Sequence, residues 1–242
     1  MTLTGCTTPP EERASEPGAT DLSAVSPALE AYDSEVIDGL WERDDLAARD
    51  RSLVTVAHLI AANQTGELQR FAERALNDGV TPAELSETVA HLAFYTGRQN
   101  AIEAAPAIAA AFDESGVDAA DLPAADLELL ALDPVAEVAR DEQVTRDYGA
   151  IAPGLVQDTT DVLFNDLWLR PDLAPRDRSL VTVVALVSSG QVDQIPFHLQ
   201  RAITNGLTET EVGGMLDQLA FFAGWRRVFT AVPVVRETLA AG

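Results

Sequence analysis

The chain has 242 residues, of which 47% are hydrophobic and 23% are charged, so it can bury a core and is not a disordered chain. Its formal net charge of −23 excludes nucleic-acid binding and attraction to anionic membranes, because both depend on basic surfaces. Every basic residue is an arginine, which excludes Schiff-base chemistry on lysine, and a single cysteine excludes disulfide frameworks and Cys-rich zinc sites. No run of about 18 apolar residues is present, so no transmembrane segment is predicted.

Residues 1–28 are predicted to form a flexible tether, because prolines lie among Thr, Ser and Glu without an apolar period. The string Leu-Thr-Gly-Cys ending at Cys6 resembles a bacterial lipobox, whose cysteine is lipidated. Only five residues precede Cys6, too few for a signal peptide. Two alternatives stay open: a cytoplasmic protein as the sequence is written, or an exported lipoprotein anchored through Cys6 if the true start lies upstream.

An internal repeat dominates the rest of the sequence. Residues 41–56 and 168–183 are identical at 13 of 16 positions, and the same offset of 127 continues without a gap to Pro106 and Pro233. The repeat predicts a first unit over 29–113, an acidic connector over 114–143 and a second unit over 144–242.

Each unit is predicted to be helical. Residues 48–62 and 67–78 carry apolar residues at helical spacing, and Thr-Pro-Ala-Glu at 81–84 has the form of a capping box at a helix start. The same signal recurs at 208–211, and both of these helices are expected to end at a glycine.

Several strings together resemble the carboxymuconolactone decarboxylase family: Arg-Asp-Arg-Ser-Leu-Val-Thr-Val, Gln-Ile-Pro-Phe-His-Leu, Asn-Gly-Leu-Thr and Ala-Phe-Phe-Ala-Gly-Trp. That family shares an all-helical fold with alkylhydroperoxidase D-like proteins. The resemblance implies an all-α fold in which two such units are related by pseudo-two-fold symmetry. Because family members act as trimers or hexamers of single units, it also implies a homo-oligomer, a trimer of tandem chains.

His198 is the main candidate for catalysis. It is expected in the first turns of a helix that begins near residue 193, where the helix dipole disfavours a positive charge and keeps the imidazole neutral. Gln194 lies four residues earlier, on the same face, and is expected to orient His198 or to stabilise the reaction intermediate. Arg178 is expected either to grip a substrate carboxylate or to form a structural ion pair.

Three further residues of the second unit are candidates for substrate binding: Trp225, Phe222 and Glu211. A capping box alone would explain Glu211, and aromatic residues more often pack in a core than line a pocket. A first-unit site would use Glu67, Arg51 and His91, although Phe71 stands at the position that matches His198. The three histidines do not have the spacing of a metal site, so neither a metal nor a cofactor is expected.

The resemblance implies a carbon–carbon lyase that removes CO₂ from a small unsaturated lactone or cyclic carboxylic acid without a cofactor. His198 would be the general acid or base. A cofactor-free isomerase or cyclase and a catalytically degenerate binding or assembly module are the alternatives. The peroxidase chemistry of related proteins is disfavoured because the Cys-x-x-Cys pair is missing.

Overall fold

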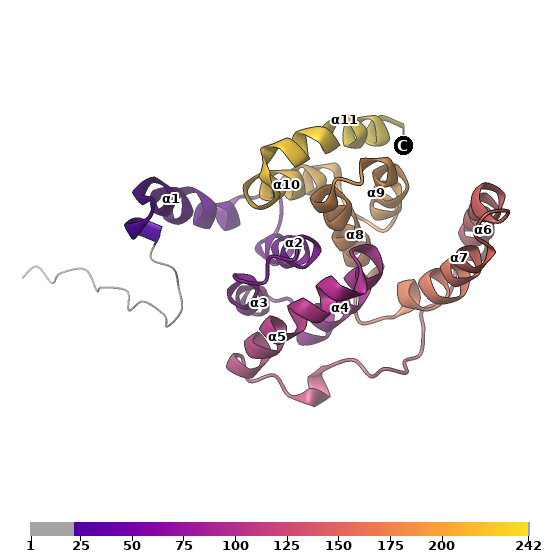
Figure 1. The fold of residues 1–242 in the computed structure, drawn as a ribbon, viewed down its shortest axis with the longest axis horizontal. Helices are drawn as coiled ribbons and strands as arrows, with labels where there is room; N and C mark the ends of the chain where they lie inside the picture. Colours follow the sequence, from indigo (N-terminus) through magenta and orange to yellow (C-terminus); the bar gives the residue numbers. More distant parts are fainter. Residues whose placement is uncertain (1–21, 242) are drawn as a thin grey trace, which may run out of the picture. The chain divides into compact units, whose positions relative to one another are not determined.

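The computed structural model describes residues 22–241, which contain helices and no strand (Figure 1). Cys6 and most of the predicted tether lie outside these residues. The described residues form two compact units, 22–40 and 41–241. Within 22–241, no helix is both long and apolar enough to cross a lipid bilayer.

The smaller unit consists of short helical segments. A 3₁₀ turn at Leu22–Ala24 is followed by α1 (Pro27–Tyr32) and by a π-helical turn at Asp33–Ile37. Ser26 caps α1 by accepting a hydrogen bond from the backbone of Leu29.

The larger unit holds both copies of the repeated central segment. The first copy contains four helices, α2 (Ala48–Ala61), α3 (Leu68–Asn77), α4 (Pro82–Tyr95) and α5 (Arg98–Glu114). The second copy contains the matching set, α8 (Pro175–Ser189), α9 (Ile195–Thr204), α10 (Glu209–Leu219) and α11 (Trp225–Ala241). The capping boxes that the sequence predicts at Thr81 and Thr208 are confirmed, and so is the all-α tandem fold.

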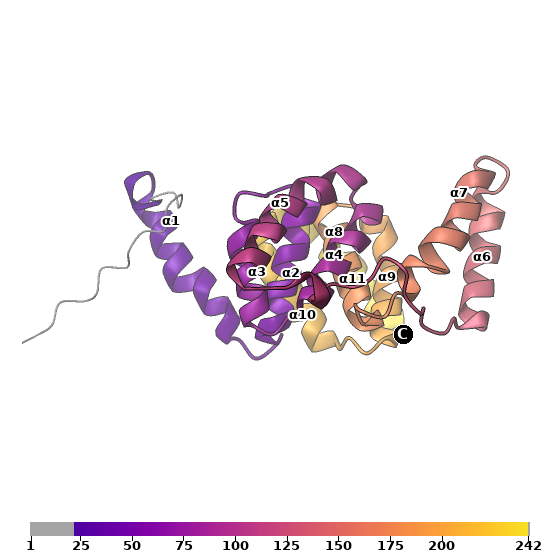
Figure 2. The same cartoon turned by 90° about the horizontal axis from the view of Figure 1, so that it is seen from below.

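The segment between the copies is partly helical. After a 3₁₀ turn at Ala119–Asp121, α6 (Pro134–Tyr148) begins inside the stretch expected to be a connector. It leads into α7 (Pro153–Asp158), a π-helical turn at Thr159–Phe164 and a 3₁₀ turn at Leu167–Leu169. Figure 2 shows α6 and α7 side by side at one end of the helical core.

Helices α2 and α8 form the centre of the core and pack against each other. Almost every residue of both helices is buried. Helix α4 of the first copy packs on α8, and α10 of the second copy packs on α2. The two copies therefore share one core, and neither buries its central helix without the other.

A symmetric set of ion pairs joins the two central helices at their N-terminal ends. Arg49 donates to Asp177 at 2.8 Å, and Arg176 donates to Asp50 at 2.6 Å. Each arginine also holds the capping glutamate of an outer helix of its own copy, Glu84 or Glu211, at 2.5 Å. Because the 127-residue offset relates every member of this set, the pairs mark the pseudo-two-fold axis.

Substitution of Asp50 tests the contribution of this network. Asp50 is 5% exposed and accepts from both Arg49 and Arg176, so Asp50→Ala leaves two half-buried guanidinium groups with fewer partners. We expect the free energy of unfolding to fall by about 3 kcal/mol, measured by urea denaturation. The exposed pair of Arg43 and Asp217 supplies the control, because Asp217→Ala should cost less than about 1 kcal/mol. Equal costs for the two variants would contradict the role assigned to the network.

Candidate active site

His198 lies in the second turn of α9 and is 7% exposed. Its ring stacks on Trp168 at 6.0 Å between centroids and meets the edge of Tyr95 at 5.3 Å. Its Nδ1 atom is buried and has no hydrogen-bond partner among residues 22–241. A buried polar atom without a partner is rare in a folded protein and points to a functional site.

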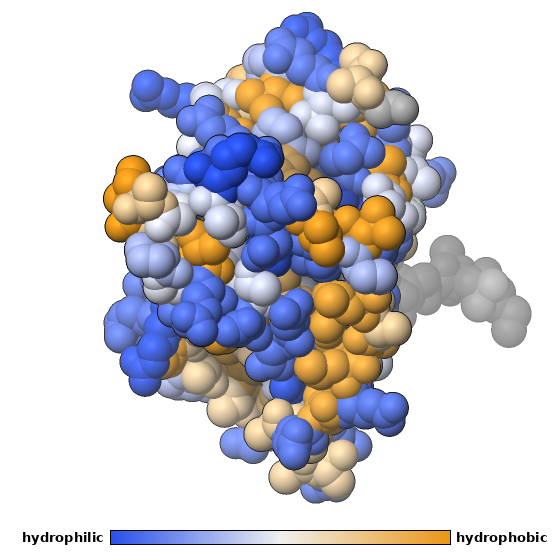
Figure 3. Space-filling view, turned by 90° about the vertical axis from the view of Figure 1, so that its right-hand side faces the viewer, coloured by the Kyte–Doolittle hydropathy of each residue, from blue (hydrophilic) through white to orange (hydrophobic). Residues whose placement is uncertain are grey.

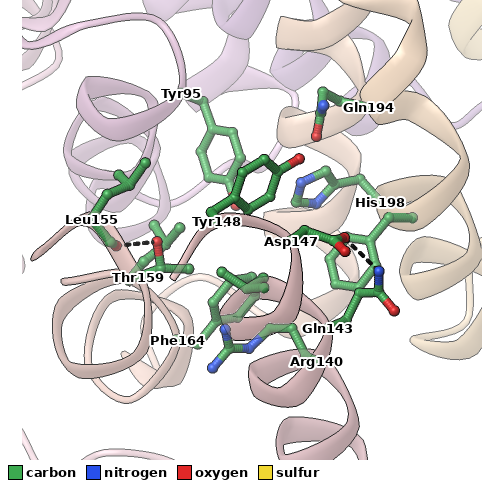
Figure 4. Close-up of a pocket in the computed structure, with 13 residues that line it drawn as sticks. Tyr95, Arg140, Gln143, Asp147, Tyr148, Leu155, Thr159, Phe164, Gln194 and His198 are labelled. Carbon is green, nitrogen blue, oxygen red and sulfur yellow. Dashed lines mark hydrogen bonds between the residues drawn. The ribbon is translucent and has the colours of Figure 1, made fainter. Parts of the chain in front are cut away.

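The imidazole borders a cavity of about 420 Å³, a size typical of small-molecule sites (Figure 4). The wall is supplied by the end of α4, by helices α6 and α7 with the π-helical turn after them, and by the start of α9 with the residue before it. The lining residues are Tyr95, Arg140, Gln143, Val144, Asp147, Tyr148, Leu155, Thr159, Leu163, Phe164, Gln194, Phe197 and His198.

Tyr95 brings a hydroxyl group from the first copy to this cavity. Its Oη accepts a hydrogen bond from Trp168 Nε1 at 2.9 Å, which leaves the phenolic proton to be donated elsewhere. Burial raises the pKa of Tyr95, so the hydroxyl keeps its proton at neutral pH. The side chain can therefore donate a hydrogen bond to an oxygen atom of a bound molecule.

Burial lowers the pKa of His198 to about 4, and the positive charge of Arg201 acts in the same direction. The free protein therefore holds a neutral imidazole at pH 7, able to accept a proton. An anionic ligand beside the ring would raise this pKa again and favour the imidazolium.

Arg178 lies behind the wall and does not border the cavity. It is fully buried and donates to Glu87 at 2.9 Å and to the carbonyl of Arg170 at 2.8 Å. Burial alone would raise the pKa of Glu87, but hydrogen bonds from Arg170 and Arg178 outweigh it and lower this pKa. Of the two interpretations given by the sequence, the structure shows an ion pair, made with the other copy.

His91 belongs to the same buried cluster. Its Nδ1 faces Arg178 at 3.4 Å, and its Nε2 contacts Thr182 Oγ1 at 2.7 Å. Because arginine can only donate, the ring is the tautomer that carries its proton on Nε2. His91 stacks on Tyr95 at 4.9 Å and so holds the wall of the site that contains His198.

The three residues predicted to bind substrate lie elsewhere. Phe222 packs against Phe71 and Trp41, Trp225 is half exposed and contacts Phe221, and Glu211 caps α10. None of the three borders the cavity beside His198, whereas Gln194 does.

The equivalent positions around Phe71 carry apolar rings. Phe71, Phe222 and Trp41 occupy the positions of His198, Tyr95 and Trp168, with ring centroids 5.2 to 6.2 Å apart. Gly214 stands where the other site has Glu87, and a Cβ atom there would lie 2.7 Å from that of Leu46. Hydrophobic packing thus replaces the polar groups.

The structure does not bring together the three residues expected to form a first-unit site. Arg51 is buried and donates to Gln218 at 3.1 Å and to Asp45. Glu67 is largely exposed and pairs with Arg70 at 2.9 Å, while His91 lies beside the other site.

Sequence reasoning missed the lining residues on α6, namely Arg140, Gln143, Val144, Asp147 and Tyr148. The signal that could have found this helix is Asp133-Pro134, a capping residue followed by proline at the first helical position. Among residues 22–241, no group of three or more His, Cys, Asp or Glu side chains could hold a metal ion.

The fold and the site define a tandem all-helical protein with a cavity of small-molecule size to which both copies contribute. A model of the Carboxymuconolactone decarboxylase family matches residues 27–110 and 153–237, more than half of the chain. The chain belongs to this family.

Two curated relatives match shorter stretches. The 4-carboxymuconolactone decarboxylase of Acinetobacter baylyi is 33% identical over 61 residues, which are 25% of this chain and 46% of that protein. The nitrosuccinic acid decarboxylase of Metarhizium robertsii is 38% identical over 65 residues, 27% of this chain and 46% of that protein. The matched stretch therefore spans less than half of each relative.

A solved structure shares the fold over most of the chain. It is a protein of Burkholderia xenovorans described as a candidate gamma-carboxymuconolactone decarboxylase subunit, with a TM-score of 0.55 and 20% identity. The alignment covers 91% of this chain and 90% of that one.

The buried imidazoles predict how stability depends on pH. Burial lowers the pKa of His58 and His198 to about 4 from the ordinary value of 6.5, and it places the pKa of His91 well below that value. At a pH between the folded-state pKa of an imidazole and 6.5, that imidazole binds a proton only in the unfolded chain. The free energy of unfolding should therefore fall as the pH decreases from 6.5. Each imidazole contributes at most about 1.4 kcal/mol per pH unit.

Urea denaturation of the wild type and of His198→Phe between pH 7.5 and 5 measures this slope. The variant copies the residue found in the first copy and removes one of three titrating groups, so its slope should be about a third smaller. A slope equal to that of the wild type would show that His198 is not buried in its neutral form.

Proposed function

We propose that the protein is a cofactor-independent decarboxylase that acts on a small unsaturated lactone or cyclic carboxylic acid. The observation that carries this proposal is the meeting of a neutral imidazole, His198, and a protonated phenol, Tyr95, at one small cavity. The decarboxylase names of the curated relatives support the reaction class.

The reaction needs one charge to be stabilised and one proton to be delivered. When the C–C bond to the carboxylate breaks, its electron pair stays on the substrate and is delocalised onto a carbonyl oxygen as a dienolate, while CO₂ leaves. The Tyr95 hydroxyl donates a hydrogen bond to that oxygen. A proton from water, relayed through His198, is added to carbon, and hydroxide remains to be taken up by CO₂ or solvent.

Gln194 and Arg178 have different roles in this proposal. Gln194 borders the cavity four residues before His198, so its amide orients the imidazole or donates to the dienolate. Arg178 acts indirectly as a positioning residue, because its guanidinium group holds Glu87 and His91 behind Tyr95.

The open cavity favours an enzyme over a degenerate binding module. At the equivalent positions around Phe71 three aromatic rings pack together, whereas His198 and Tyr95 border a cavity. A cofactor-free isomerase or cyclase would use the same proton-transfer groups, and substrate screening separates it from a decarboxylase by the absence of CO₂ release.

Truncation of His198 tests the proposal. In a screen of lactone acids read by CO₂ release, His198→Ala should lower kcat by about 100-fold or more, because the proton relay is lost. Phe71→Ala is the matched control, since it truncates the ring at the equivalent position of the first copy. Circular dichroism checks that both variants fold.

Tyr95→Phe should lower kcat by about tenfold or more and leave the fold intact, because it removes only the hydroxyl.

Unchanged turnover in the folded His198→Ala variant would remove His198 from the mechanism.

We also propose that the chain assembles as a homotrimer. Apolar side chains are exposed along α6, α7 and the turns beside them: Val135, Val138, Ile151, Leu155 and Val162. Figure 3, which views the molecule from the side of α6 and α7, shows separate hydrophobic areas on a mostly hydrophilic surface. Apolar surface of this kind is typical of subunit contacts.

Light scattering after size-exclusion chromatography tests this assembly. The wild type should have a mass of about three times 25.8 kDa. Val138→Glu places a charge on the exposed apolar surface and should lower the mass, whereas Thr230→Glu at an exposed position of α11 should not. A wild-type mass equal to one chain would contradict the proposal.

A further inference from the structure

Tyr148 is a cavity residue that the mechanism above does not use. It is the last residue of α6 and is 51% exposed, yet it lines the cavity that contains His198. Figure 4 shows its side chain extending into the cavity, with the hydroxyl group pointing toward Gln194 and His198. The phenol therefore approaches the proton-transfer groups from the solvent-exposed rim of the cavity.

The turn after α6 fixes the position from which the Tyr148 side chain projects. The carbonyl of Tyr148 accepts hydrogen bonds from the backbone of Ile151 at 3.0 Å and of Ala152 at 2.8 Å. Gly149 donates to the carbonyl of Thr145 at 2.9 Å, and a Cβ atom at residue 149 would lie 2.5 Å from that oxygen. The backbone at the rim is thus well defined, whereas the Tyr148 hydroxyl group has no hydrogen-bond partner within 22–241. A phenol in this state can donate its proton to a ligand.

Two other polar side chains of the cavity wall are already engaged. Thr159 donates to the carbonyl of Leu155 at 2.7 Å. The amide of Gln143 is paired at both ends, with Asp147 at 2.5 Å and with Arg146 at 2.6 Å. Since Asp147 is a carboxylate and can only accept, neither α7 nor the middle of α6 offers a free donor.

The cation among the described lining residues is not available to a ligand. The side chain of Arg140 is 5% exposed, and its guanidinium group donates to Glu137 at 2.7 Å and to Thr160 at 3.2 Å. It also stacks on Phe164 at 4.3 Å, and Asp141 lies 3.8 Å away. An acid group in the cavity is therefore left to neutral donors.

A neutral donor suits the acid group that reacts. The carboxylate loses its charge as it leaves as CO₂, so a cation paired with it would stabilise the ground state more than the transition state and slow the reaction. A hydroxyl group binds the carboxylate more weakly than a cation does, and it still fixes the orientation of the breaking bond. Of the neutral donors, Tyr95 and Gln194 already have roles in the mechanism, which leaves Tyr148.

We propose that Tyr148 is a specificity-determining residue, whose hydroxyl group donates a hydrogen bond to the carboxylate that the substrate loses. This inference rests on the function proposed above. The two phenols then have separate tasks: Tyr148 binds the acid group before it leaves, and Tyr95 stabilises the dienolate that remains. The hydrogen bond from Tyr148 selects for ligands that carry an acid group on the side of the cavity rim.

Binding of an unreactive cyclic acid tests this role without turnover. In isothermal titration calorimetry at constant ionic strength, the wild type should bind benzoate about tenfold more tightly than benzamide, because a hydrogen bond to a carboxylate is stronger than one to an amide. Tyr148→Phe removes only the hydroxyl group. It should weaken the binding of benzoate about tenfold and that of benzamide by less than about threefold.

Tyr32→Phe is the matched control, because Tyr32 is an exposed tyrosine that does not border the cavity. This variant should bind benzoate as the wild type does. Urea denaturation establishes that each variant is folded. A wild type that does not prefer benzoate to benzamide, or undiminished binding of benzoate by folded Tyr148→Phe, would overturn the role of Tyr148.

Turnover separates the two phenols and keeps this inference distinct from the proposed function. With a lactone acid that releases CO₂, Tyr148→Phe should raise KM about tenfold and change kcat by less than about threefold, whereas Tyr95→Phe lowers kcat. Weaker benzoate binding by Tyr148→Phe without CO₂ release from any lactone acid would preserve the carboxylate site and remove the decarboxylase. Release of CO₂ with a KM unchanged by Tyr148→Phe would do the reverse.

Discussion

The packing of α2 against α8 is the constraint on which the rest of this protein depends. Reciprocal bonds from Arg49 to Asp177 and from Arg176 to Asp50 fix the two helices across the pseudo-two-fold axis. Since α4 of one copy covers the central helix of the other, residues distant in sequence meet at one wall. The candidate site is therefore a property of the pair of copies, because Tyr95 comes from the first copy and His198 from the second.

The two copies share the same helical scaffold, but the side chains at the two equivalent places differ. Where one of the two pseudo-symmetric places has an imidazole and a phenol beside a cavity, the other has two phenylalanines packed on a tryptophan. Buried polar groups lower the stability of the fold unless they form hydrogen bonds, whereas the packed aromatic rings around Phe71 raise it. The place around Phe71 thus supports the core, while the place around His198 presents polar groups to a cavity.

Charge is distributed around the site so that each group has a defined state. Glu87 stays ionised because two arginines donate to it, and His91 and His198 stay neutral because burial disfavours their charged forms. In an interior of low dielectric constant these protonation states resist change. A charged ligand placed among the groups shifts their pKa values strongly. These local contacts, and not the net negative charge of the protein, set the protonation states of the three groups.

The sequence by itself determined the helices, their caps and the tandem arrangement, because these follow from local periodicity, capping residues and a repeat of constant offset. It also pointed to His198 through a motif contained in one helix. Only the tertiary structure decided which copies of each motif meet: Tyr95 and His91 of the first copy lie beside His198, and Phe222 lies with Phe71. Exchange of outer helices across the pseudo-two-fold axis is the reason, since no spacing along the chain shows whether a helix packs on its own copy or on the other. Likewise, Arg178 could be assigned to a substrate or to an ion pair by sequence, and only burial against Glu87 distinguished the two.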